Sequence, residues 1–323
     1  MNAPTGFLAR VRLEPAGPDH WSAASGTERM ALGLLGAQAM VAAGHTVDTR
    51  WRWVHAVHVT RLDEGAPATD HSASATGDGA PGPVLHQVER THDTPARSVR
   101  LVRSLLQDTP LAVTTVTFAA PRSGLGPSHQ RAAAVEDVPP PGTLAPAEAG
   151  GALDVRHLDR ARWQRPADPA APNRMWTRVT EEIPDEILLH AAAIAMAADL
   201  LLVAPAALSA TGEWADLEAG RGLRAVPLDL SIRIHRGFRA DDWMLHGHES
   251  VSAADYRTLT TGWFVSPAGR LVATISQETA LLPPVTGPTG PQPAAPVPAA
   301  CTTPWRNTER MPCSTTSPSR PRT

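Results

Sequence analysis

Residues 30–43 read MALGLLGAQAMVAA. This segment is apolar on nearly every side, and a helix of that kind must be enclosed by the fold rather than lie on its surface. Strand-like runs follow it at residues 50–62, 84–91, 97–106 and 111–119. The pattern predicts an antiparallel sheet that curves around one buried helix.

The second half of the chain repeats this order. Residues 175–181 form a leading strand, and Pro184 opens a helix that runs to about Val203. Further strands are predicted at residues 225–236, 243–252, 256–265 and 270–281. Turn residues close the last hairpin of each half, at 107–110 and at 266–269. Two copies of one unit in tandem are therefore predicted, in the α+β class.

Three stretches differ from the rest in composition. Residues 66–82 are rich in small and polar residues and predict a surface loop, whereas the Pro/Ala/Gly-rich residues 139–151 separate the two similar halves and predict a linker. From residue 283 onward the composition cannot bury enough apolar area to offset chain entropy. The predicted organisation is a domain at 1–138, a linker, a domain at 152–282 and a disordered tail at 283–323.

Charge and cysteine content exclude several classes of protein. The formal net charge is only -3 and no lysine occurs in the 323 residues, so the basic footprint of a nucleic-acid binder is missing. Cys301 and Cys313 both lie in the tail, which excludes a disulfide framework for the fold. The N-terminal residues carry no basic flank followed by an apolar stretch. We therefore expect a cytoplasmic protein.

Residues 187–208 are apolar enough to be tested as a membrane span. The run contains His190, Asp199 and Pro205, and a carboxylate near the centre of a bilayer costs about 2.5 to 3.5 kcal/mol. The segment is predicted to be a buried helix and not a membrane span.

Several short runs occur in a characteristic order: GAQAMVAA, VHAVHVTRLDEG, VTFAAP, LDVR, MWTRVTEEIPDEILLH, AADL, IRIHRGF and VATISQE. In this order and spacing the chain resembles the acyl-CoA thioesterase II family, over residues 30–282 and most specifically over 153–277. The resemblance implies two fused hotdog domains, each a curved antiparallel sheet around a central apolar helix. It also implies hydrolysis of fatty acyl-CoA to fatty acid and coenzyme A, without a cofactor. We expect a homo-oligomer.

In that family an Asp, a Thr or Ser, and a Gln position and activate water. Carried across by position, the Asp falls on Asp199 in AADL and the Gln on Gln277 in ISQE. The hydroxyl position falls on Pro227, which has neither a hydroxyl nor a backbone N–H. Leu230 stands where the family usually has a histidine. Loss of one such donor often reduces activity about 100-fold, so reduced or lost activity is expected.

The residues alone leave both a catalytic and a purely structural role open for Asp199 and for Gln277. Asp199 on an enclosed helix is either desolvated, which raises its pKa toward that of a general base at neutral pH, or caps or pairs locally near a helix end. Strand alternation places Gln277 on the inward face with Ala273 and Ile275. Its amide then needs partners, from a polar site or from neighbouring backbone.

The same alternation predicts that Pro227, Asp229 and Ser231 face away from Leu228 and Leu230. Ser231 carries a hydroxyl on the predicted face of Pro227. It lies four residues further along the strand, about 13 Å away. It is therefore not a convincing substitute.

His235, Arg236 and Arg239 are candidates for contact with the phosphates of coenzyme A, although an exposed, solvated cluster of charges is the competing interpretation. His246 and His248 share a strand face without a clear third ligand, so no metal site is predicted. The sequence contains no G-x-S-x-G motif, which leaves a serine-nucleophile hydrolase without support.

Three functions remain open. The first is a thioesterase that acts on acyl-CoA. The second is an acyl-CoA or acyl-carrier binding protein of the same fold that is catalytically impaired, which Pro227 favours. The third is a hydratase, which would need an Asp/His pair and is disfavoured by Leu230.

Overall fold

A computed structural model describes most of the chain up to residue 282. The described residues are 6–23, 31–48, 53–62, 83–119, 129, 135, 138–147, 151–158, 173–211 and 224–282. They all belong to one compact unit, Met1–Pro284. The loop predicted at 66–82, the tail predicted at 283–323 and both cysteines lie outside the described residues.

The first half contains two helices and six strands within its described residues. They are α1 (Phe7–Val11), β1 (Leu13–Gly17), β2 (His20–Ala23), α2 (Leu32–Gly44), β3 (Trp53–Arg61), β4 (Val84–Asp93), β5 (Arg97–Leu106) and β6 (Thr109–Ala119). The predicted helix and four predicted strands are confirmed as α2 and β3 to β6. The N-terminal hairpin of β1 and β2 was not predicted, because β1 is mostly exposed and contains proline and glycine.

The second half follows a short 3-10 turn, η2 (Pro141–Thr143). Its elements are β7 (Leu153–His157), β8 (Asn173–Val179), α4 (Ile187–Thr211), β9 (Arg224–Pro227), β10 (Asp229–Ile234), β11 (Met244–Ala254), β12 (Arg257–Val265) and β13 (Leu271–Leu282). The leading strand, the helix and the last three strands are confirmed. The domain boundary at 139–151 stays a prediction.

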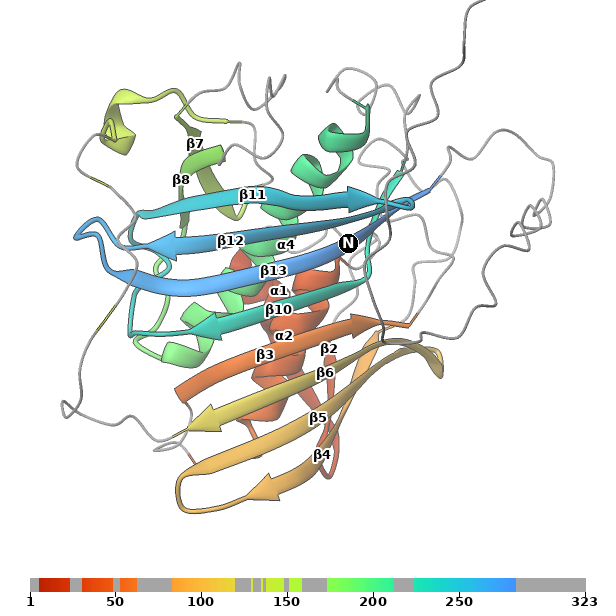
Figure 1. Cartoon of the computed structure of the whole chain (residues 1–323). Coiled ribbons are helices and arrows are strands. Elements are labelled where there is room, and N and C mark those ends of the chain that lie inside the picture. Colours follow the sequence, from red (N-terminus) through yellow and green to blue (C-terminus); the bar gives the residue numbers. More distant parts are fainter. Residues whose placement is uncertain are drawn as a thin grey trace, which may run out of the picture. The chain divides into compact units, whose positions relative to one another are not determined.

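The described strands form a continuous antiparallel sheet in the order β1-β2-β4-β5-β6-β3-β10-β13-β12-β11-β8-β7, with β9 also paired to β13. The two halves join edge to edge through β3 and β10, where Val57 lies opposite Ile232. Figure 1 shows α2 and α4 on the same side of this sheet. The predicted α+β class, with sheet wrapped around apolar helices, is confirmed.

The two central helices pack directly against each other. Every residue of α2 is buried except Leu34, which is half-buried. A Cβ added at Gly33 would overlap the carbonyl oxygen of Ala195 and would lie 2.5 Å from the Cβ of Asp199. Glycine at position 33 therefore permits the N-terminal turn of α2 to touch α4 beside Asp199.

One irregularity corrects the predicted strand at 225–236. Pro227 lies opposite Thr279, whereas Ser231 lies opposite Ser276, so the pairing with β13 shifts by one residue between β9 and β10. At the shift, the N–H of Leu228 donates to the carbonyl of Glu278. The prediction that Pro227 shares a face with Ser231, opposite Leu230, is wrong, because this bulge turns Pro227 to the inner face with Thr279.

Candidate active site

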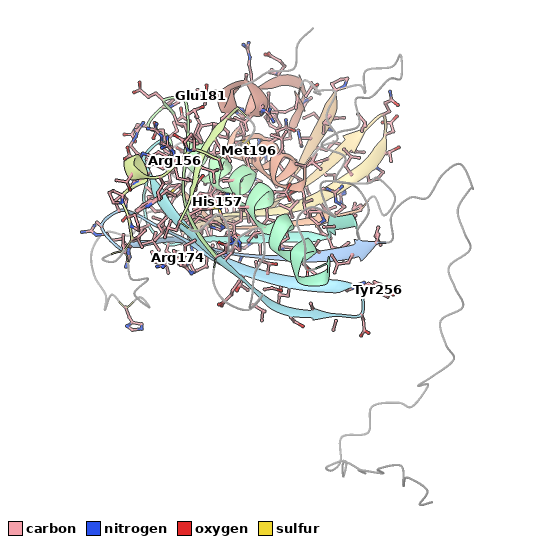
Figure 2. The ribbon with its side chains drawn as sticks, turned by 90° about the horizontal axis from the view of Figure 1, so that it is seen from above. Arg156, His157, Arg174, Glu181, Met196 and Tyr256 are labelled. Atoms are coloured by element: carbon pink, nitrogen blue, oxygen red, sulfur yellow. The ribbon has the colours of Figure 1, made fainter. Side chains whose placement is uncertain are left out.

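Asp199 and Gln277 meet inside the second half. The Nε2 of Gln277, on β13, donates to the Oδ1 of Asp199, on α4, at 3.1 Å. Asp199 is 5% exposed and Gln277 is fully buried, as strand alternation predicted for Gln277. In Figure 2, Met196 labels α4 and Tyr256 labels the turn between β11 and β12. The structure thus brings the two predicted residues together.

The carboxylate of Asp199 also receives hydrogen bonds from the first half of the chain. The backbone N–H groups of Gly33 and Leu32, in the first turn of α2, donate to it. The N-cap residue Ala31 makes no side-chain bond of its own. A negative charge is stabilised at this position, because the first N–H groups of a helix lack intrahelical partners and carry partial positive charge. Asp199 therefore caps a distant helix and not its own.

The environment raises the pKa of Asp199. Burial is the main cause, since it disfavours the charged form. The N–H of Gly33, the positive charge of Arg61 and the amide of Gln277 oppose the shift without cancelling it. Arg61 lies on β3, and its Nε donates to the carbonyl of Pro227 on β9 at 2.9 Å. A carboxylate with a raised pKa is a better proton acceptor than an exposed aspartate, as a general base requires.

Polar side chains continue along the inner face of the sheet beside Gln277. Thr279 is fully buried, and its Oγ1 donates to the Oε1 of Gln277 at 3.5 Å. On β12, Thr260 lies opposite Gln277 and Thr258 lies opposite Thr279. The hydroxyls of Thr258 and Thr260 are buried and make no hydrogen bond to any described residue. Buried hydroxyls without partners are uncommon in a packed core.

Comparison with known proteins shows which proteins this chain resembles. Residues 132–281 match the family model of the acyl-CoA thioesterase C-terminal domain. Human acyl-coenzyme A thioesterase 8 is 28% identical in an alignment of 300 residues that covers 83% of this chain and 86% of the human protein. The crystal structure of an acyl-CoA thioesterase II from Mycobacterium marinum is 28% identical, with a TM-score of 0.70 over 87% of this chain and 99% of that chain. The chain is thus similar to acyl-CoA thioesterases along most of its length.

The predicted hotdog fold is also confirmed. A conserved protein of unknown function with a hot dog fold from Alicyclobacillus acidocaldarius has a TM-score of 0.63 over 86% of this chain and 98% of that chain. At 16% identity this likeness shows the fold alone. The antiparallel sheet with two central helices is the arrangement expected of tandem hotdog units.

Two of the basic residues predicted to bind substrate, His235 and Arg239, have partners other than Asp199. The N–H of His235 donates to the carbonyl of Val272, five residues along β13 from Gln277, which is about 17 Å. The guanidinium of Arg239 is bonded to Asp241 at 2.6 Å and to the carbonyl of Ile183 at 2.8 Å. The role of His235, Arg236 and Arg239 in binding stays a prediction.

His246 and His248 also face inward, on β11. The Nδ1 of His248 lies 3.0 Å from the Nε2 of His246. Burial lowers the pKa of both rings, to about 3 for His246, so both are neutral. Among the described residues, no group of three His, Cys, Asp or Glu side chains is placed to hold a metal ion.

Two further features bear on binding. A hollow of about 510 Å³ is lined by Arg233, Glu249 and Trp263 among others, and it includes neither Asp199 nor Gln277. Within the part of the chain that the structure describes, each helix is too short or too polar to span a bilayer.

The sequence did not predict that Arg61 and the first turn of α2 lie beside Asp199, or that Thr279 bonds to Gln277. Arg61 and α2 belong to the other half, and nothing in one sequence indicates that they reach Asp199. Thr279 had a visible sign, because it shares the strand parity of Gln277 and is polar on a face that is otherwise mostly apolar.

Proposed function

We propose that this chain hydrolyses fatty acyl-CoA thioesters to free fatty acid and coenzyme A, with water activated by Asp199 and Gln277. The observation that carries the proposal is the 3.1 Å hydrogen bond between these two residues in a buried, polar part of the second half. Similarity to acyl-CoA thioesterases supports the choice of substrate.

Asp199 acts as the general base. Its ionised carboxylate accepts a proton from a water molecule as the water oxygen attacks the thioester carbonyl carbon. The raised pKa of Asp199 strengthens this step, since a more basic carboxylate takes the proton more readily. The Gln277 amide and the N–H groups of Gly33 and Leu32 hold the carboxylate by donating to it. The two carboxylate oxygens together have about four acceptor positions, so one remains for water.

The tetrahedral intermediate carries negative charge on the former carbonyl oxygen. The N-terminal turn of α2 lies beside Asp199 and contributes the partial positive charge of a helix N-terminus, and Arg61 adds a full positive charge nearby. Collapse of the intermediate breaks the carbon–sulfur bond. The proton held by Asp199 then passes to the departing thiolate, which restores the carboxylate and releases the thiol of coenzyme A.

Release of free thiol from medium-chain and long-chain acyl-CoA, followed with a colorimetric thiol reagent, tests the proposal. Asp199→Asn should reduce the rate by about 100-fold or more, because an amide cannot accept the proton. Tight binding of acyl-CoA should persist in that variant. Wild-type protein that releases no thiol from any chain length would overturn the proposal.

A second candidate is an acyl-CoA binding protein without turnover. Pro227 favours it, because this residue faces the inner side of the sheet and brings no hydroxyl to the site. Calorimetric binding of acyl-CoA to wild-type protein that shows no hydrolysis would establish this alternative.

A further inference from the structure

Thr279 and Pro227 are direct neighbours across β13 and β9. Residues in such an antiparallel pair point to the same face, with Cβ atoms about 4.5 to 5.5 Å apart. The bulge at Leu228 turns Pro227 inward, so the pair faces the helices. A hydroxyl on residue 279 therefore lies beside the place where a hydroxyl on residue 227 would stand.

Thr279 is connected to Asp199 through Gln277. Its Oγ1 donates to the Oε1 of Gln277 at 3.5 Å, and the Nε2 of Gln277 donates to Asp199. An amide has a donating end and an accepting end. A donor at the Oε1 end keeps the NH₂ group directed at the carboxylate, whereas the reversed amide would place its oxygen against a carboxylate oxygen.

We propose that Thr279 supplies the hydroxyl that position 227 lacks, by fixing the orientation of the Gln277 amide against Asp199. Thr279 is thus a positioning residue, and the inference rests on the proposed hydrolytic function. The hydroxyl enters the site from β13 and not from β9. Pro227 is then tolerated, because the neighbouring strand already carries the group.

The other inward hydroxyls do not fill this role. Thr260 lies opposite Gln277 and Thr258 opposite Thr279, yet neither hydroxyl bonds to a described residue. Among the described residues, Thr279 is the threonine whose hydroxyl is bonded to the amide.

Steady-state kinetics on four variants test the inference. Thr279→Val should lower kcat about tenfold with KM changed less than about twofold, because a lost hydrogen bond is worth roughly that factor. Thr279→Ser should keep kcat near wild type. Thr114→Val is the matched control, since Thr114 is a buried threonine of the first half whose hydroxyl is unbonded within the described residues. Its kcat should not change.

The double variant Pro227→Thr with Thr279→Val should recover most of the lost kcat, because it moves the hydroxyl across the strand pair. A Thr279→Val variant with wild-type kcat would overturn the inference. So would a double variant that remains as slow as Thr279→Val alone while folding like wild type by circular dichroism.

A measurement without turnover separates this inference from the proposed function. The side-chain ¹⁵N–¹H₂ resonances of Gln277, assigned by their loss in Gln277→Ala, should shift and broaden in Thr279→Val and remain unchanged in Thr114→Val. If wild type releases no thiol but these resonances shift, the proposed function fails and the positioning role stands. Unchanged resonances would contradict the positioning role whatever the activity.

Discussion

The backbone N–H of Gly33, in the first half of the chain, donates to the carboxylate of Asp199 in the second half. A helix end from one half and an acidic residue from the other thus form one site. The contact depends on a position where any side chain would collide with α4. The candidate site is therefore a product of both halves.

Gly33→Ala should damage both folding and activity. The new Cβ would overlap the Ala195 carbonyl and crowd Asp199, and overpacking of this kind costs about 1 to 3 kcal/mol. Urea denaturation should show that loss, and thiol release should fall at least about tenfold. Gly142→Ala is the control, because a Cβ there would meet nothing within 4 Å. A Gly33→Ala variant as stable and active as this control would contradict the described packing.

The pH dependence of hydrolysis should report the ionisation of Asp199. Burial raises its pKa above 3.8, and only the ionised form accepts a proton. The rate kcat/KM should therefore fall as pH decreases, with a midpoint above 3.8. Arg61 lowers the pKa of Asp199, so Arg61→Gln should move that midpoint to higher pH. Arg257→Gln, which removes an exposed pair with Glu278, should leave it in place; equal shifts in both variants would refute the role of Arg61.

Pro227→Thr alone should raise kcat less than about threefold. Position 227 faces the site, but Thr279 already provides a hydroxyl beside it. Ser231→Ala should have no effect, because the Ser231 hydroxyl is bonded to His58 and not to the site. A gain of about 100-fold in Pro227→Thr, the scale of a missing donor, would show that Thr279 does not replace it. Thiol release measured on purified variants decides between these results.

Acid should weaken the first half through His86. Burial lowers the pKa of His86 to about 4, and its ring nitrogens lie 3.0 Å from Ser104 Oγ and 3.2 Å from Gln38 Oε1. A histidine with a lowered folded pKa contributes full stability above about pH 6.5, and that contribution is lost as pH falls toward 4. Between pH 7.5 and pH 5 the free energy of unfolding should drop by about 2 kcal/mol from this residue.

Urea titrations at both pH values measure the drop. His86→Gln should flatten the pH dependence by about the same amount, because glutamine does not titrate. His92→Gln serves as an exposed comparison on the same strand and should retain the full slope. An unchanged slope in His86→Gln would assign the acid sensitivity to other groups.

Local patterns in the sequence were sufficient for much of the fold. The all-round apolar character of α2 and α4 requires burial, and strand alternation placed Gln277 inward correctly. Alternation failed at Pro227, because one extra residue at Leu228 reverses the face. Pro227 itself was the available sign, since proline inside a sheet is largely confined to edges and bulges. The position of Asp199 at the end of α2 could not be predicted, since it depends on how two distant helices pack.

The pairing of β3 with β10 makes the two halves permanent neighbours. In an assembly of separate subunits, dilution makes the subunits dissociate, and any site formed between them is lost. Here the polypeptide itself sets the effective concentration of one half around the other. The carboxylate of Asp199 and the N-terminal turn of α2 therefore stay together at any protein concentration. Each half can then carry only part of the site.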